Sequence, residues 1–209
     1  MDRGTVILHI VPLSAFDQSP ALPLLKIERD FHSFVPIKSS TANNVRINFD
    51  GILKTSNADQ RATEQRAYVQ LFRNGIIETV TSTIMAVSSG SAMISYLDDS
   101  LVHEVTRSMS DLAGVGVEPP YALLVSLIGV SGAQFNFARD PRVPSYDSLG
   151  NRLDRDQYHF DEVLFETIPT SLEECARIMR PILDQMANAG GQATSPIFDE
   201  HGRYIPLRR

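Results

Sequence analysis

The stretch Tyr68-Val-Gln-Leu-Phe-Arg-Asn-Gly-Ile-Ile-Glu-Thr-Val-Thr81 decides what kind of fold this chain of 209 residues can form. Two runs of β-branched and apolar residues, 68–72 and 76–81, flank Arg73-Asn74-Gly75. Asn-Gly between two such runs is the strongest short-range signal for a β-hairpin, because both residues tolerate a positive φ. The stretch therefore predicts two adjacent antiparallel strands joined by a type I′ turn.

Further strands are predicted on both sides of this hairpin. Thr5–Val11 is β-branched and apolar and ends at Pro12, and Val45–Thr55 alternates with an interruption at Asp50-Gly51. Tyr121–Val130 is almost continuously apolar, which is typical of a central strand that is buried on both faces. Shorter strands are expected at Gln134–Phe137 and Glu162–Ile168, and the small residues Ser88–Ser91 indicate a linker.

The first main helix is predicted from periodicity. An apolar face recurs at spacings of four, four and three residues through Leu101, Val105, Met109 and Leu112. Asp98, Asp99 and Ser100 precede this face and offer N-cap oxygens, while Gly114 and Gly116 end the helix. A short helix over Leu24–Asp30 is also expected.

The second main helix begins at Ser171, where Glu174 three residues later completes a capping box. Its buried stripe is formed by Leu172, Cys175, Met179, Ile182 and Met186. Pro181 lies inside this stripe and should kink or split the helix near Arg180.

The order of these elements indicates the fold class. Strands follow one another without intervening helices, which favours antiparallel pairing over a parallel βαβ arrangement. We therefore expect one α+β domain over residues 1–209, with a largely antiparallel sheet and two main helices packed on one of its faces.

Composition excludes several classes of function. The formal net charge is −6, from 19 basic and 25 acidic residues, which disfavours direct binding of nucleic acid by this chain. Cys175 is the single cysteine, so no internal disulfide can form, and the composition fits a reducing cytoplasm. No apolar run approaches the roughly 18 residues that a membrane helix needs. A cytoplasmic protein without membrane contact is the simplest interpretation.

One long segment, residues 139–162, combines charged and aromatic residues. Its residues 139–160 show no periodicity and are predicted to form a loop. Basic and aromatic side chains together can hold a single nucleic-acid strand, and the candidates are Arg139, Arg142, Arg152 and Arg155. Asp140, Asp147, Asp154 and Asp156 are interleaved with them and cancel much of their field. A solvated charged loop is therefore the favoured interpretation.

The same segment holds the candidate metal ligands. Asp154, Asp156 and Glu162 could together contact a divalent cation, although Arg152 and Arg155 would neutralise their charge. The alternative to a non-catalytic protein is thus a metal-assisted hydrolytic or nucleic-acid-processing enzyme that uses this segment.

Other catalytic signatures are missing from the sequence. Neither a nucleophile motif of the Gly-x-Ser-x-Gly type nor a glycine-rich phosphate loop occurs. Cys175 lies on the buried stripe of its helix, where a cysteine behaves as a small hydrophobic residue. The sequence therefore assigns no catalytic residue and no cofactor.

Several segments, taken in order, carry a family resemblance. They are Leu8–Asp17, Asn48–Gly51, Val69–Glu78, Gly116–Pro120 with Ser126–Val130, Leu153–Asp156 with Glu162–Leu164, and Ser195–Gly202. Together they resemble the C-terminal domain of bacterial proteins that carry an N-terminal Schlafen/AlbA-like DNA-binding module, proteins usually described as ATP-binding or helix-turn-helix proteins. The DNA-binding module itself has no counterpart in this chain.

The resemblance implies a non-catalytic accessory domain for sensing, oligomerisation or contact with a partner protein. It supplies no catalytic residues to carry over. A further hypothesis is that the chain is a C-terminal part of a longer protein. In that case its first strand, Thr5–Val11, would lack a neighbour and leave an unpaired sheet edge.

Overall fold

The computed structural model describes residues 4–17, 22–31, 33–38, 44–56, 66–88, 91–138 and 148–207. Its main sheet has eight strands, and seven of them follow the order β11-β8-β1-β5-β4-β3-β2, while β12 also pairs with β8. All of these pairs are antiparallel. The strands are β1 (Thr5–Pro12), β2 (Asn44–Ile47), β3 (Gly51–Thr55), β4 (Ala67–Phe72), β5 (Ile77–Thr81), β8 (Tyr121–Ile128), β11 (Gln157–His159) and β12 (Val163–Phe165).

The hairpin predicted from the sequence is formed by β4 and β5, but its turn is of another type. The Phe72 amide donates to the Ile76 carbonyl at 2.8 Å, which leaves the three residues 73–75 in the loop. Gly75 has a φ of 88°, whereas Asn74 does not have a positive φ. A three-residue loop with a left-handed glycine therefore replaces the expected type I′ turn.

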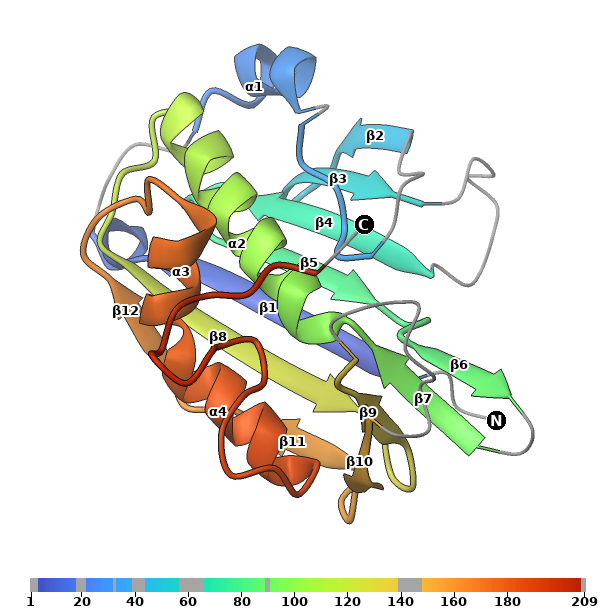
Figure 1. Ribbon diagram of the computed structural model, residues 1–209. Coiled ribbons are helices and arrows are strands. Elements are labelled where there is room, and N and C mark those ends of the chain that lie inside the picture. The colour runs from blue at the N-terminus through green and yellow to red at the C-terminus, as the bar shows by residue number, and fades with distance from the viewer. Residues whose placement is uncertain are drawn as a thin grey trace.

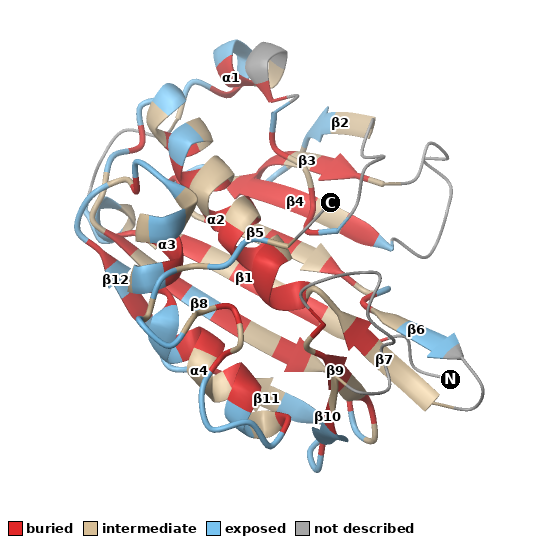
Figure 2. Cartoon of the chain, in the orientation of Figure 1, coloured by how far each residue is buried: buried red, intermediate tan, exposed pale blue. Residues whose placement is uncertain are grey.

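The central strands β1 and β8 show why the sheet has one covered and one open face. Burial alternates along both strands, and Figure 2 shows the buried and less buried residues in turn. The expectation that 121–130 is buried on both faces is wrong, because the side chains that point away from the helices stay partly exposed. The expected unpaired edge at Thr5–Val11 is also wrong, since β1 pairs with β5 on one side and β8 on the other.

The helices lie on one face of this sheet, as the sequence predicted (Figure 1). They are α1 (Leu24–Asp30), α2 (Leu97–Gly114), α3 (Leu172–Ile178) and α4 (Arg180–Ala189), with a short 3-10 helix η1 (Leu13–Phe16) after β1. The Ser171 hydroxyl accepts the Glu174 amide at 3.1 Å, which caps α3 as expected. The break before Pro181 divides the second main helix into α3 and α4.

The start of α2 differs from the expectation that aspartates cap it. The residue before the helix is Tyr96, in a left-handed conformation and without a side-chain cap. Asp99 instead accepts hydrogen bonds from the Tyr204 hydroxyl at 2.7 Å and from the Leu207 amide at 3.2 Å. Its carboxylate thus fastens the C-terminal segment to the start of α2.

A second, smaller sheet has the order β10-β9-β7-β6. Its strands are β6 (Met85–Ser88), β7 (Ser91–Ser95), β9 (Gln134–Asn136) and β10 (Leu149–Arg152). Ser88 of β6 pairs with Ser91 of β7 at the end of a hairpin. The predicted linker therefore begins and ends in two paired strands. The predicted strand over 45–55 is likewise a hairpin, of β2 and β3.

The predicted loop over 139–160 is only partly a loop. Residues 139–147 lie outside the described residues, while β10 and β11 occupy much of the remainder. Both strands are four residues or shorter, which is too short for a periodic pattern to appear in the sequence.

The hydrophobic core fills the space between the helices and the covered face of the main sheet. Leu8 and Leu127 from the sheet, Val105 and Met109 from α2, and Cys175 from α3 have no exposed surface. In the part of the chain that the structure describes, no helix combines the length and apolar character required to cross a membrane.

Candidate functional site

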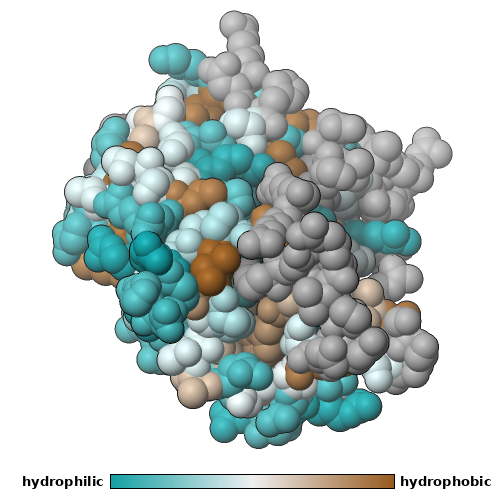
Figure 3. All heavy atoms as spheres, viewed as in Figure 1, coloured by the Kyte–Doolittle hydropathy of each residue, from teal (hydrophilic) through white to brown (hydrophobic). Residues whose placement is uncertain are grey.

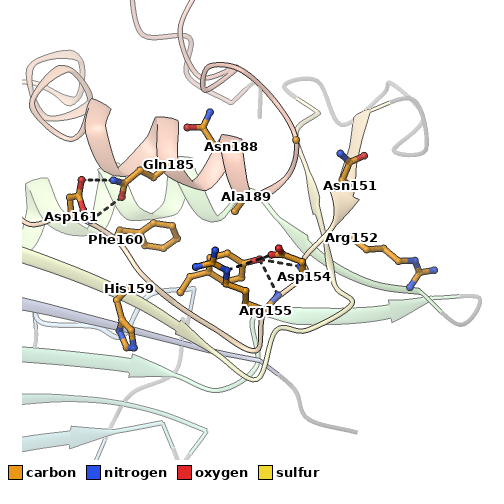
Figure 4. A pocket seen from close by; sticks show the side chains of 12 residues that line it. Asn151, Arg152, Asp154, Arg155, His159, Phe160, Asp161, Gln185, Asn188 and Ala189 are labelled. Carbon is orange, nitrogen blue, oxygen red and sulfur yellow. Dashed lines mark hydrogen bonds and ion pairs between the residues drawn. The ribbon is translucent and has the colours of Figure 1, made fainter.

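Three of the predicted site residues, Arg152, Asp154 and Arg155, line a surface pocket of about 500 Å³ between α4 and the β10–β11 connection (Figure 4). Polar side chains form most of its rim, and Phe160 and Ala189 provide apolar surface. The lining residues are Asn151, Arg152, Asp154, Arg155, Tyr158, His159, Phe160, Asp161, Gln185, Asn188, Ala189 and Gly191.

The β10–β11 connection is held by one tyrosine. The Tyr158 hydroxyl donates to Asp154 Oδ1 at 2.6 Å and accepts the amides of Asp154 and Arg155 at 3.1 and 3.3 Å. This hydrogen bond from Tyr158 holds the pKa of the Asp154 carboxyl below its ordinary value. Partial burial, followed by the bond to Asp154, raises the pKa of Tyr158. Asp154 is therefore a structural acceptor in a tight turn.

On the helix side of the pocket, the polar side chains likewise find their hydrogen-bond partners within the protein. Gln185 donates to Asp161 Oδ2 at 2.5 Å and accepts the Asp161 amide at 2.9 Å. The Asn188 amide group donates to the carbonyls of Gln192 and Ala193 and so shapes the end of α4. These contacts fix the pocket walls and leave few polar groups directed at a ligand.

The basic candidates do not converge. Arg152 donates to the Gly132 carbonyl at 3.3 Å and points away from Asp154, as Figure 4 shows. Arg155 is largely exposed, and its Nε lies 4.0 Å from Asp154. Arg139 and Arg142 lie outside the described residues. Arg152 and Arg155, the two candidates that the structure describes, thus form no continuous basic track of the kind that holds a nucleic-acid strand.

The predicted carboxylate site for a metal is not formed. The Asp154 carboxylate accepts a hydrogen bond from Tyr158, and Asp156 is exposed on the β10–β11 connection. Glu162 is exposed on the connection to β12. Across the described residues, no three or more His, Cys, Asp or Glu side chains are grouped closely enough to hold a metal ion. The expectation that Asp154, Asp156 and Glu162 share a cation is therefore not supported by the structure.

Two polar groupings on the open face of the sheet were missed by sequence reasoning. Ser126 Oγ lies 2.9 Å from His159 Nδ1, and His9 Nε2 lies 2.8 Å from Glu78 Oε2. Each pair joins residues that are distant in the sequence, so no local motif could have revealed it. The Ser126–His159 pair has no third group that orients the histidine among the described residues, as an activated nucleophile requires.

Cys175 is unsuited to act as a nucleophile. Its side chain is fully buried, and burial raises the pKa of its thiol to about 11. A reactive cysteine needs solvent access and a lowered pKa. The sequence-based interpretation of Cys175 as a core residue is confirmed.

A second surface, around Arg73, was not foreseen. It exposes the side chains of Phe16 (77%), Leu25 (75%) and Phe49 (91%), and also those of Leu13 and Ile47. These five residues and the adjacent pocket are called the Arg73 surface below. The pocket has a volume of about 410 Å³ and is lined by Ser14, Asp17, Leu22, Arg73, Asn74, Gly116, Val117, Glu118 and Pro119.

Arg73 joins the segments of this surface. Its amide donates to the Asp50 carbonyl at 2.9 Å, and its carbonyl accepts the Leu22 amide at 3.1 Å. Its guanidinium Nε donates to the Phe49 carbonyl at 2.9 Å. The hairpin turn, the β2–β3 turn and the approach to α1 are therefore fixed to one another.

Comparisons with known proteins give no relative for this arrangement. No protein-family model matches the chain, and searches of curated proteins and of solved structures return no significant match.

Proposed function

We propose that this chain is a non-catalytic accessory domain of a bacterial Schlafen/AlbA-like DNA-binding protein and that it acts by binding another protein surface. The observation that carries the proposal is the Arg73 surface. Five of the nine large hydrophobic residues that the described structure exposes lie there. Exposed large apolar side chains on segments that are held together beside polar residues are typical of protein–protein interaction sites.

The surroundings of this surface support the same proposal. Four of the segments that carry the family resemblance, Leu8–Asp17, Asn48–Gly51, Val69–Glu78 and Gly116–Pro120, contribute residues to it. By contrast, hydrophilic side chains dominate over α3 on the helix-bearing face that Figure 3 shows.

The chemistry of the polar pocket favours a binding protein over an enzyme. Its carboxylate and amide groups are used by Tyr158, Gln185 and the end of α4. The metal-assisted enzyme is retained as the alternative because Asp154, Arg152 and Arg155 still line one pocket.

A turnover assay separates the two functions. The purified chain is incubated with single- and double-stranded DNA, RNA and chromogenic phosphate and carboxylate esters, with magnesium, manganese or zinc. We expect no turnover above buffer, and no change in the light-scattering mass when short DNA is added. Metal-dependent turnover that Asp154→Asn abolishes, while Glu166→Gln retains it, would overturn the proposal in favour of the enzyme.

A further inference from the structure

The open face of the main sheet has an apolar centre that the strand register defines. Ile7 of β1 lies between Val80 of β5 and Ser126 of β8, and all three side chains share this face. Side chains that are paired on one face of a sheet lie about 5 Å apart and diagonal ones about 7–8 Å apart, so such neighbours form a continuous surface. The apolar residues that follow this register on β1, β5, β8 and β12 are called the open-face patch below, and they are Ile7, Val11, Val80, Ala122, Leu124, Ile128 and Leu164.

All of these residues keep exposed surface in the single chain. Leu124 on β8 is 40% exposed and Leu164 on β12 is 47% exposed. Polar residues border the open-face patch on both sides. Gln157 and His159 of β11 follow it beyond β8, and Tyr68 of β4 follows it beyond β5. An apolar centre within a polar rim is the organisation of protein–protein interfaces.

The polar groups inside this face already have partners. Glu78 Oε2 lies 2.8 Å from His9 Nε2, and Glu78 Oε1 accepts the Tyr68 hydroxyl at 2.6 Å. Ser126 Oγ lies 2.9 Å from His159 Nδ1. Burying a polar group without a partner is costly, whereas these groups keep their partners when the face is covered. The face therefore suits an apolar partner surface better than a charged one.

The sequence of β8 supports a cover on this face. Tyr121–Val130 is almost continuously apolar, a pattern that is typical of strands with both faces covered. In the single chain, helices cover only one face of the sheet (Figure 1). A second layer on the open face accounts for the apolar residues that the single chain leaves partly exposed.

The area of this face matches half of a small dimer interface. Neighbouring strands lie about 4.8 Å apart, and a strand rises about 3.3 Å per residue. Five strand widths and the eight residues of β1 therefore span about 24 Å by 26 Å, or about 600 Å². Two copies would bury about 1,200 Å², the lower end of the range for stable interfaces, which corresponds to a dimer that dissociates on dilution.

A second copy of the chain also fits the chemistry of this face. In a two-fold dimer the same surface faces itself. Apolar side chains that face apolar side chains require no matching pattern of charges, so the open-face patch is complementary to itself. Two sheets pack face to face about 10 Å apart with their strands about 30° from parallel, which brings the central strands β1 and β8 of both copies together.

We infer that the open-face patch is the interface of a two-fold homodimer in which the two main sheets pack face to face. The inference goes beyond the proposed function, because the open-face patch shares no residue with the Arg73 surface.

The first test is the mass of the chain by sedimentation equilibrium from about 1 µM to about 300 µM, the range in which an interface of this size dissociates. We expect a monomer–dimer equilibrium. Leu124→Glu should raise the dissociation constant at least tenfold, because it places a carboxylate in the apolar centre of both copies. Leu25→Glu is the matched control, since Leu25 is 75% exposed on α1 and belongs to the Arg73 surface.

A second variant avoids a new charge. Ile7→Thr with Val80→Thr keeps β-branched side chains on two paired strands and removes apolar surface from the centre of the patch. It should also raise the dissociation constant at least tenfold. Circular dichroism verifies that each variant is folded.

The second test reports on the face itself. The chain contains no tryptophan, so Leu124→Trp introduces a single fluorophore at this face. We expect its emission to shift to shorter wavelength as the concentration rises through the dissociation constant, because the indole leaves water. Leu25→Trp should keep the same emission at every concentration.

The outcomes separate the inference from the proposed function. A chain that stays monomeric at the highest concentration overturns the homodimer. A dimer that Leu25→Glu disrupts and Leu124→Glu leaves intact overturns the assignment of the interface to the open-face patch, as does a Leu124→Trp emission that does not change with concentration. The proposed function is judged separately, by the turnover assay.

Discussion

Gly150 shows how one residue shapes the polar pocket. It is buried in β10, and the next amide, that of Asn151, donates to the Gly190 carbonyl at 2.7 Å. A Cβ on Gly150 would lie 2.6 Å from the Gly190 oxygen and 2.8 Å from Cε2 of Phe137. Only a residue without a side chain lets β10 approach the end of α4 so closely.

Gly150→Ala is therefore expected to lower the free energy of unfolding by about 2 kcal/mol, as overpacking of a tight contact does. Urea denaturation measures the change. Gly114→Ala is the matched control, because a Cβ there meets nothing within 4 Å at the end of α2 and should be neutral or stabilise by about 0.5 kcal/mol. Equal stability of the Gly150 variant and the native chain would show that β10 does not pack this closely.

At the scale of elements, the open face of the sheet is joined across β1, β5 and β4 by polar side chains. Glu78 Oε2 lies 2.8 Å from His9 Nε2, and Glu78 Oε1 accepts the Tyr68 hydroxyl at 2.6 Å. The hydrogen bond with His9 is the largest cause that lowers the pKa of Glu78, and the bond with Tyr68 adds to it. Burial and the hydrogen bond to Glu78 raise the pKa of the Tyr68 hydroxyl.

The lowered pKa fixes the sign of a pH dependence. A carboxyl whose folded pKa lies below its ordinary value of 4.5 stabilises the fold above that pH, and this contribution is lost as the pH falls through the folded pKa. Glu78→Gln should cost about 1 kcal/mol at pH 7.

The difference between Glu78→Gln and the native chain should shrink as the pH falls below about 4.5. Urea unfolding at pH 7, 5 and 3.5 tests this expectation. Burial raises the pKa of Glu104 and Asp111, so their contributions to stability change with pH in the opposite sense. Comparing the native chain with the variant at each pH cancels these contributions. A pH-independent difference would exclude Glu78 as the titrating group.

At the scale of the whole molecule, a charged cluster under α2 ties the α1 segment to the rest of the fold. Arg107 pairs with the buried carboxylate of Glu104 and donates to the Val35 carbonyl at 2.8 Å. The Ser108 hydroxyl donates to Glu104 at 3.0 Å. Burial raises the pKa of Glu104, and its pairing with Arg107 opposes this effect.

Arg107→Ala should destabilise the chain by about 2 kcal/mol, because it leaves a buried carboxylate without its partner. The expected loss is below that of a fully buried pair, since the Arg107 side chain is 40% exposed. The double variant Glu104→Gln/Arg107→Ala should recover part of the loss. Urea unfolding measures both variants, and hydrogen exchange should show faster opening at residues 33–38. A double variant less stable than Arg107→Ala would contradict this account.

The sequence by itself determined the local elements and the fold class. Asn74-Gly75 between two β-rich runs specified the β4–β5 hairpin, Ser171 and Glu174 specified the start of α3, and Pro181 specified its break from α4. These signals are local, because turn and cap preferences depend on neighbouring residues. The helical period of α2 and the runs of adjacent strands were enough to predict an antiparallel sheet with helices on one face.

Only the tertiary structure decided which surfaces can act. The Arg73 surface joins residues 13–17, 22–25, 47–50, 73–74 and 116–119, whose proximity follows from long-range pairing of the strands. The candidate carboxylates Asp154, Asp156 and Glu162 are close in sequence but not grouped as metal ligands, because Asp154 is engaged by Tyr158 and β11 separates Asp156 from Glu162. Closeness along a chain constrains backbone conformation, whereas a functional surface depends on contacts that only the folded chain creates.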